Sequence, residues 1–237
     1  MRFFRVILFS VMVFATFCTT AQNRIGVDMG AGWCYLKNGE YTPGHYKFAT
    51  DGDITLGVHY LRRMNKNIYI GGRVMFQQYT FSYTYDVVDS ALRNGGEVAN
   101  KSSYLLVAPT IDYGFGDRQI VHVFLSYAYG MLLRGSQNNH TYTYNYNGNF
   151  YDNSFRTDGE ISKTITRWDI GLSQHIPISP DWYATVTESY GMLSNALTQV
   201  DNPLTPGLTL KPGYFCITIG FAYKFLYTGW NARWDDE

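Results

Sequence analysis

Residues 214–225 read YFCITIGFAYKF. From 215 to 225 the odd-numbered positions are aromatic or branched apolar, and the positions between them hold Cys, Thr, Gly, Ala and Lys. A period of two indicates a β-strand with two unlike faces. In a soluble sandwich the second face would be richly charged. Here it is small and carries a single charge, so the stretch predicts a strand with one face toward lipid and the other lining a narrow barrel.

The same alternation recurs in seven further segments. They cover residues 24–36, 53–63, 68–85, 105–115, 121–131, 161–176 and 182–193. In the third segment the apolar positions change parity between Phe76 and Tyr79, which predicts either a bulge or a strand that projects beyond the membrane. Glu188 falls at a position that simple alternation sends toward lipid, and a bulge near Val186 or a place at the outer rim would explain it. Eight is an even number of strands, which permits antiparallel closure.

The connections between these segments alternate between long and short. Residues 37–52, 86–102, 135–160 and 195–212 form long polar connections, and residues 64–67, 116–119 and 177–181 form short ones. Outer-membrane barrels have this asymmetry, with short periplasmic turns and long extracellular loops. The sequence therefore predicts an all-β fold, a closed eight-stranded antiparallel transmembrane β-barrel with four long extracellular loops.

The first 21 residues have the composition of a secretory signal peptide. Arg2 and Arg5 precede an apolar stretch from Val6 to Phe17, and small residues lead up to Ala21. We expect the barrel over residues 22–227 and a short periplasmic tail over 228–237. The 237-residue chain has 19 basic and 19 acidic residues, so it lacks the basic surplus expected of a protein that binds nucleic acid.

The chain resembles the eight-stranded outer-membrane β-barrel proteins of Bacteroidetes, whose architecture is that of OmpA- and OmpX-like barrels. The resemblance rests on residues 19–22 (TTAQ), 25–32 (IGVDMGAG) and the closing strand 214–225, and it extends over residues 24–226. It implies a bacterial outer-membrane location and contact with outer-membrane lipid and lipopolysaccharide. Many such barrels end on an aromatic residue; here Phe225 and Tyr227 are instead followed by residues 228–237.

The sequence lacks the motifs of common catalytic sites. No G-x-S-x-G, P-loop or H-E-x-x-H pattern is present, and the five histidines are far apart in sequence. His45 and His140 share long connections with aspartates, but no serine or cysteine is tied to them by spacing. We expect no enzyme activity, no cofactor and no metal; an outer-membrane acyltransferase or protease is the rival class.

Charged residues occur on the faces that should line the barrel. These residues are Asp28, His59, Arg63, Arg73, Asp112, His122, Arg167, Asp169 and Lys224. They could line a solute channel. The alternative, which we favour, is a network of paired charges that fills a lumen too narrow for an aqueous pore, because eight strands leave room only for side chains.

Two mature cysteines are expected near the outer rim of the first and last strands. Cys34 and Cys216 both fall on the small-residue face, and closure makes their strands neighbours. Secreted proteins can form disulfides, so a bridge across this seam is possible if the register brings the two Cα atoms within about 7 Å.

The third long connection carries the clearest signal for binding. Aromatic residues alternate there with Thr, Asn and Gly, a composition that suits adaptable contact surfaces. The candidate contact residues are Tyr142, Tyr144, Tyr146, Phe150 and Tyr151. An extended hairpin above the membrane is the structural alternative. In the second long connection, Ser90 within Asp89-Ser90-Ala91 resembles a Bacteroidetes O-glycosylation acceptor.

Together these features predict a monomeric, non-enzymatic outer-membrane barrel with a structural or surface-binding role, and an extracellular glycan or protein as its ligand. A subunit of an outer-membrane secretion or uptake machine is the alternative.

Overall fold

The computed structural model describes residues 20–35, 46–88, 92–116, 119–145, 150–157, 161–202 and 205–228. Eight long strands form the barrel: β1 (Thr20–Tyr35), β3 (Asp53–Arg63), β4 (Ile68–Val88), β5 (Leu92–Phe115), β6 (Val121–Asn145), β8 (Thr164–Pro177), β9 (Trp182–Leu193) and β12 (Gly213–Thr228). The shorter strands are β2 (Tyr46–Thr50), β7 (Phe150–Thr157), β10 (Thr198–Asn202) and β11 (Thr205–Leu210). No helix in the described residues is long and apolar enough to cross a membrane.

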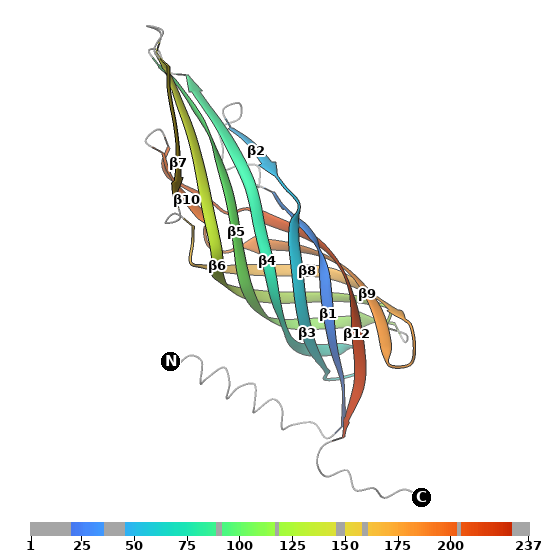
Figure 1. Ribbon diagram of the computed structural model, residues 1–237. Coiled ribbons are helices and arrows are strands. Elements are labelled where there is room, and N and C mark those ends of the chain that lie inside the picture. Colours follow the sequence, from blue (N-terminus) through green and yellow to red (C-terminus); the bar gives the residue numbers. More distant parts are fainter. Residues whose placement is uncertain are drawn as a thin grey trace, which may run out of the picture.

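The barrel is closed and antiparallel, as the sequence predicts (Figure 1). Each long strand pairs with its chain neighbour, and β1 pairs with β12 to complete the ring. This seam runs without interruption from Thr20 opposite Thr228 to Tyr35 opposite Gly213. Closure gives every barrel strand a hydrogen-bonding partner on both sides, which is what lipid requires of a spanning sheet.

Three barrel strands continue far beyond the rest of the barrel. Strands β4 and β5 pair out to Val88 opposite Arg93, and β5 and β6 pair out to Leu92 opposite Asn145. Strand β7 adds to β6, and β2 adds to β4. In Figure 1 these strands rise together above one side of the barrel as a continuous sheet. We call the part of β4, β5 and β6 beyond Tyr79, Ser102 and Gly135, with β2 and β7, the projecting sheet.

The projecting sheet corrects the expected loops at 86–102 and 135–160. Their Asn-, Ser- and Gly-rich composition predicts loops, but hydrogen bonding between neighbouring strands holds most of these residues in the sheet. The parity change in β4 has the same origin, because β4 keeps an unbroken register with β5. Tyr79, Phe81 and Tyr83 simply point inward and are buried. The strand therefore projects and does not bulge.

An apolar belt surrounds the outside of the barrel. Side chains such as Val27, Ile111, Ile170 and Phe221 each expose half or more of their surface. Exposed Trp33 and Tyr190 lie toward the end of the barrel that carries the projecting sheet. Exposed Trp182 lies at the opposite end, where the short turns connect the strands. An apolar wall between aromatic residues is the exterior of a barrel that spans a membrane.

The interior is divided into a polar half and a mainly apolar half. Near the projecting sheet, aromatic and aliphatic side chains form a buried core that includes Tyr79, Tyr104, Leu106, Ile165 and Tyr214. Toward the short turns the buried side chains are mostly Arg, Asp, His, Gln, Ser and Thr. This polar half contains most of the charged residues that the sequence places in the lumen.

Candidate functional site

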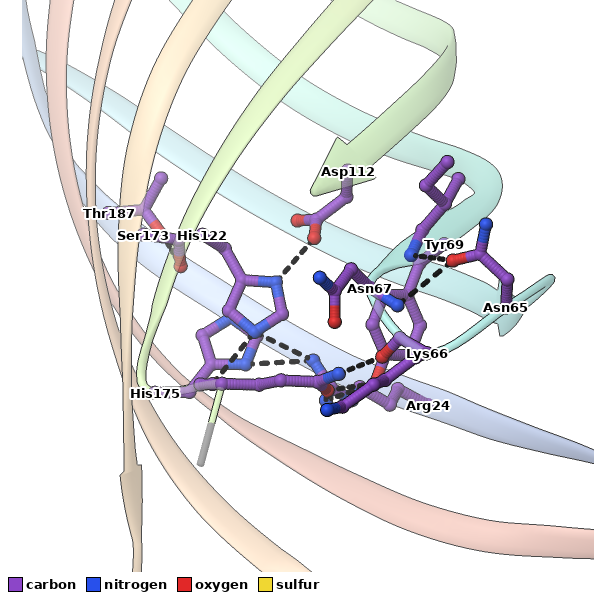
Figure 2. A network of polar contacts seen from close by, with 12 residues as sticks. Arg24, Asn65, Lys66, Asn67, Tyr69, Asp112, His122, Ser173, His175 and Thr187 are labelled. Carbon is purple, nitrogen blue, oxygen red and sulfur yellow. Dashed lines mark hydrogen bonds and ion pairs between the residues drawn. The ribbon is translucent and has the colours of Figure 1, made fainter. Parts of the chain in front are cut away.

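The polar lumen is organised around Arg24 at the short-turn end. Arg24 Nη1 lies 3.0 Å from His175 Nδ1 and 3.3 Å from His122 Nε2. Arg24 Nη2 donates a hydrogen bond to the Tyr69 hydroxyl at 2.7 Å. The guanidinium carbon also lies 4.0 Å from the centre of the Tyr69 ring. Figure 2 shows these side chains pointing toward one another inside the barrel.

A carboxylate and a glutamine complete this group, which we call the Arg24 cluster (Arg24, Tyr69, Asp112, Gln119, His122 and His175). Asp112 Oδ1 lies 2.5 Å from His122 Nδ1. The His122 and His175 rings stack with their centres 4.0 Å apart. The Tyr69 hydroxyl donates to Gln119 Oε1 at 2.5 Å. Arg24 comes from β1 and His122 from β6, so the cluster crosses the lumen from one wall to the opposite one.

A second polar group lies further along the lumen. Asp28 Oδ2 is 2.7 Å from His59 Nδ1, and Thr185 Oγ1 donates to Asp28 Oδ1 at 3.3 Å. Arg73 pairs in register with His59, and its guanidinium lies 3.8 Å from the centre of the Phe124 ring. Asp28, His59 and Arg73 thus lie in the lumen beside groups that can offset the cost of burial.

A third group, which we call the Arg167 cluster, lies below the apolar core. Arg167 forms a two-point ion pair with Asp169 at 2.5 and 3.0 Å. Its Nη1 also donates to Gln77 Oε1 at 2.7 Å and to the Tyr79 hydroxyl at 2.6 Å. Gln77 and Tyr79 belong to β4, whereas Arg167 belongs to β8, so this cluster also bridges separate walls.

Two of the nine predicted lumen charges lie outside these groups. Arg63 is bound at the first short turn, where it donates to Gln22 Oε1 and to the backbone oxygens of Asn65 and Lys66. Lys224 is half-buried on β12 opposite Arg24, and its backbone NH donates to Asp181.

Several residues that hold the lumen together are not among the nine predicted lumen charges. Arg24 is the most important, since it carries the first cluster. It stands at the first position of the predicted strand, and alternation from Gly26 would have assigned it to the lumen. His175 lies on the predicted lumen face but has no charged residue near it in sequence. Tyr69 and Gln119 give no sequence signal, because only the closed barrel brings them to Arg24.

The cysteines lie on neighbouring strands and on the same face, but the proposed disulfide is absent. Both Cys34 and Cys216 are free, buried thiols. The register explains this: Cys216 is opposite Gly32, and Cys34 is opposite Tyr214, so the two are offset by two residues. Cys34 Sγ instead contacts Asp53 Oδ2 at 3.6 Å. Diagonal positions of this kind are too far apart for a disulfide without backbone movement.

The predicted contact residues lie in strands where the structure describes them. Tyr142 and Tyr144 belong to β6, and Phe150 and Tyr151 belong to β7. Tyr144 is in register with Phe150. This segment therefore forms the extended hairpin that the sequence offers as the structural alternative, and binding by these residues stays a prediction. Tyr146 and Ser90 lie outside the described residues.

Glu188 is a polar exception in the apolar belt. It is exposed on β9, in register with Leu172 of β8 and Ile217 of β12. Neither pairing has a bulge, so the bulge suggested near Val186 is wrong. Exposed Gln174 lies diagonally across from Glu188 on β8, opposite Val186. Two outward polar side chains thus adjoin one another on the β8–β9 wall.

The polar groups in the lumen contact one another and the backbone, as expected of networks that stabilise the barrel. The Asp112–His122 pair orients an imidazole, yet its remaining contacts are Arg24 and a backbone oxygen rather than a serine or cysteine. The cysteine thiols contact Asp53 and Thr55. Among the described residues, no three His, Cys, Asp or Glu side chains are grouped to hold a metal ion.

Comparison with known proteins finds similar barrels only among solved structures. No family model and no curated protein matches the chain. Neisserial surface protein A is 10% identical, with 86% of this chain and 97% of that chain covered and a TM-score of 0.44. Ail, the attachment invasion locus protein of Yersinia pestis, is 10% identical over 86% and 99%, with a TM-score of 0.36. The N-terminal barrel of Pseudomonas aeruginosa OprF is 10% identical over 86% and 99%, with a TM-score of 0.34. These structures resemble the chain in fold alone.

Proposed function

We propose that this protein is a non-enzymatic integral barrel of the bacterial outer membrane whose projecting sheet binds an extracellular glycan or protein. The projecting sheet is the observation that supports the proposal. Its three long strands remain paired well beyond the level where β9 and β12 end, so the barrel holds a broad platform clear of the membrane. A rigid platform loses little conformational entropy when it binds a ligand.

The barrel itself serves as an anchor in this proposal. The Arg24 and Arg167 clusters join opposite or separate walls, and the apolar core fills the end next to the projecting sheet. A filled lumen cannot admit a sizeable solute, whereas it can support an appended sheet. The aromatic and asparagine-rich strands β6 and β7 are the part of the platform whose composition suits contact with varied ligands.

The test compares the mature protein with a variant of the projecting sheet. Tyr142→Ser, Tyr144→Ser and Tyr151→Ser are combined, and both proteins are folded into vesicles and applied to glycan and peptide arrays. Binding by the wild type that the triple variant loses, with unchanged heat-dependent gel migration, supports the proposal. Binding that survives in the triple variant contradicts a role for these residues.

The alternative role is that of a subunit in an outer-membrane secretion or uptake machine. Glu188 favours it, because a carboxylate on the lipid-facing wall is costly unless a membrane partner supplies a donor. Extraction in mild detergent should then yield a complex larger than the barrel, and Glu188→Leu should release the partner. Extraction of a monomer by the same detergent argues against this role.

A further inference from the structure

The two ring nitrogens of His122, on β6, face different kinds of partner. Its Nδ1 lies 2.5 Å from the Asp112 carboxylate, so this nitrogen carries a proton and donates. Its Nε2 lies 2.9 Å from the backbone oxygen of Gln119, which can only accept, and 3.3 Å from Nη1 of Arg24, which can only donate. No single protonation state of the ring satisfies both contacts of Nε2.

The two protonation states of His122 therefore select different hydrogen-bond partners. The protonated ring donates from Nε2 to Gln119 and leaves Arg24 to its other contacts. The neutral ring keeps its proton on Nδ1 toward Asp112 and accepts from Arg24 through Nε2 (Figure 2). The backbone oxygen of Gln119 then loses this donor. Imidazole is the side chain whose charge ordinarily changes between about pH 5 and pH 8.

Gln119 is held in a backbone conformation that costs free energy. Its φ is 49°, in the left-handed region, which a residue with a side chain adopts only when its surroundings hold it there. Its side chain accepts from the Tyr69 hydroxyl and donates to the backbone oxygen of Lys66 in the first short turn. Gln119 thus joins two short turns, and its contact with His122 is one of those that keep it in place.

The charges around His122 allow both states. Arg24 and Asp112 offset one another when the ring is neutral, and a protonated ring places its added positive charge beside Asp112. His175 stacks on the ring and accepts from Arg24 through Nδ1, so it is neutral while this contact holds. The other titratable or charged groups that face the cluster are Tyr69 and Arg73 on β4, His59 and Arg63 on β3, Tyr183 on β9 and Lys224 on β12.

We propose that His122 is a pH-sensitive switch at the short-turn end of the lumen. In acid the ring takes up a proton from solvent and fastens Gln119. At alkaline pH the ring loses that proton, releases the Gln119 backbone oxygen and becomes an acceptor for Arg24. The switch loosens the turn without emptying the lumen, because the other contacts of the Arg24 cluster are kept in both states. It is independent of any ligand of the projecting sheet.

The experiment follows the mature barrel in lipid nanodiscs by NMR between about pH 5 and pH 8. The ring nitrogen signals of His122 report its protonation directly. Amide hydrogen exchange at residues 119–121, corrected for the intrinsic pH dependence of exchange, reports how tightly the turn is held. The variants are His122→Gln and, as a matched control, His140→Gln, which removes an exposed histidine from the same strand.

His122 should change from charged to neutral within this range. Exchange at residues 119–121 should become about fivefold faster at the alkaline end, the effect of losing one hydrogen bond of ordinary strength. His140→Gln should behave like the wild type, and His122→Gln should show no pH dependence at these residues.

Three results would overturn the proposal. These are a His122 ring that keeps one protonation state across the range, a titration that leaves exchange at residues 119–121 unchanged, and the wild-type pH dependence in His122→Gln. The first two are measured on the wild type, so they decide the matter even if His122→Gln does not fold.

Discussion

At the scale of single residues, Arg24 is the side chain on which the polar lumen depends most. It is 3% exposed, and its guanidinium contacts two histidines and a tyrosine from other strands. Removing one member of a buried charged group leaves the remaining charges without a partner. This usually costs more folding stability than replacing the whole group with apolar residues. The sequence could place Arg24 in the lumen by alternation, but not identify its partners, because they come from strands far away in the chain.

We expect Arg24→Gln to lower the free energy of unfolding by about 3 kcal/mol, because Asp112 and the histidines lose their buried cation. Urea unfolding of the barrel in vesicles measures the change. Arg63→Gln is the control, since Arg63 lies at the short turn, partly exposed, and should cost about 1 kcal/mol or less. Equal stabilities of Arg24→Gln and wild type would contradict the structural role of the cluster.

Glu188 is the opposite case, a charge that we expect to destabilise the isolated barrel. Its side chain is exposed between Leu172 and Ile217 in the apolar belt. We expect Glu188→Leu to raise the free energy of unfolding in vesicles by about 1–2 kcal/mol, because lipid-facing charges are unfavourable at depth and acidic ones less so than basic ones. Thr164→Leu, at the outer end of β8, is a control with a smaller expected gain. A loss of stability in Glu188→Leu would show that the carboxylate already has a favourable partner in the barrel.

At the scale of elements, period-two alternation predicted the eight barrel strands but not how far they extend. The pattern works for β12 or β1 because lipid and lumen impose opposite requirements on alternate residues. Above the membrane both faces of a strand can be polar, so Asn94, Glu97 and Asn100 in β5 resemble a loop. What holds them in a strand is pairing with β4 and β6, which depends on residues elsewhere in the chain.

This difference gives a direct prediction for the projecting sheet. Backbone amides of residues 95–102 in β5 should exchange with solvent slowly, at rates closer to those of barrel strands than to those of loops, because both edges of β5 are paired. Hydrogen exchange followed by mass spectrometry measures these rates. The short turn at residues 64–67 supplies the fast-exchanging reference. Exchange of 95–102 as fast as that turn would restore the loop interpretation.

At the scale of the whole molecule, closure of the barrel and filling of its lumen depend on each other. Closure brings Arg24 to His122 across the lumen and Arg167 to Gln77 between separate walls. Those contacts then occupy the space that a channel would need. The balance of charges on the lumen faces could be foreseen from sequence, whereas the division into a polar half and an apolar half depends on which side chains closure brings together.

A filled lumen predicts a barrel without porin-like conductance. Purified protein in planar bilayers should give no stable single-channel openings of porin size. A folded variant that combines Arg24→Ala with Arg167→Ala should show a higher conductance than the wild type. The reason is that the two substitutions remove the side chains that fill both clusters. Stable large openings in the wild type would refute the filled lumen.

Closure at the β1–β12 seam brings the lumen clusters together, and directed cross-linking across this seam tests closure itself. Ala31 and Ile217 are opposite one another on the outward face. In a background with Cys34→Ala and Cys216→Ala, the pair Ala31→Cys and Ile217→Cys should oxidise to a disulfide, identified as a linked peptide by mass spectrometry. The control pair joins Ala31→Cys to Leu125→Cys on the opposite wall, and it should remain reduced. A closed barrel predicts the first bond and not the second; a folded protein that fails to form the first bond, or forms both equally, would contradict closure.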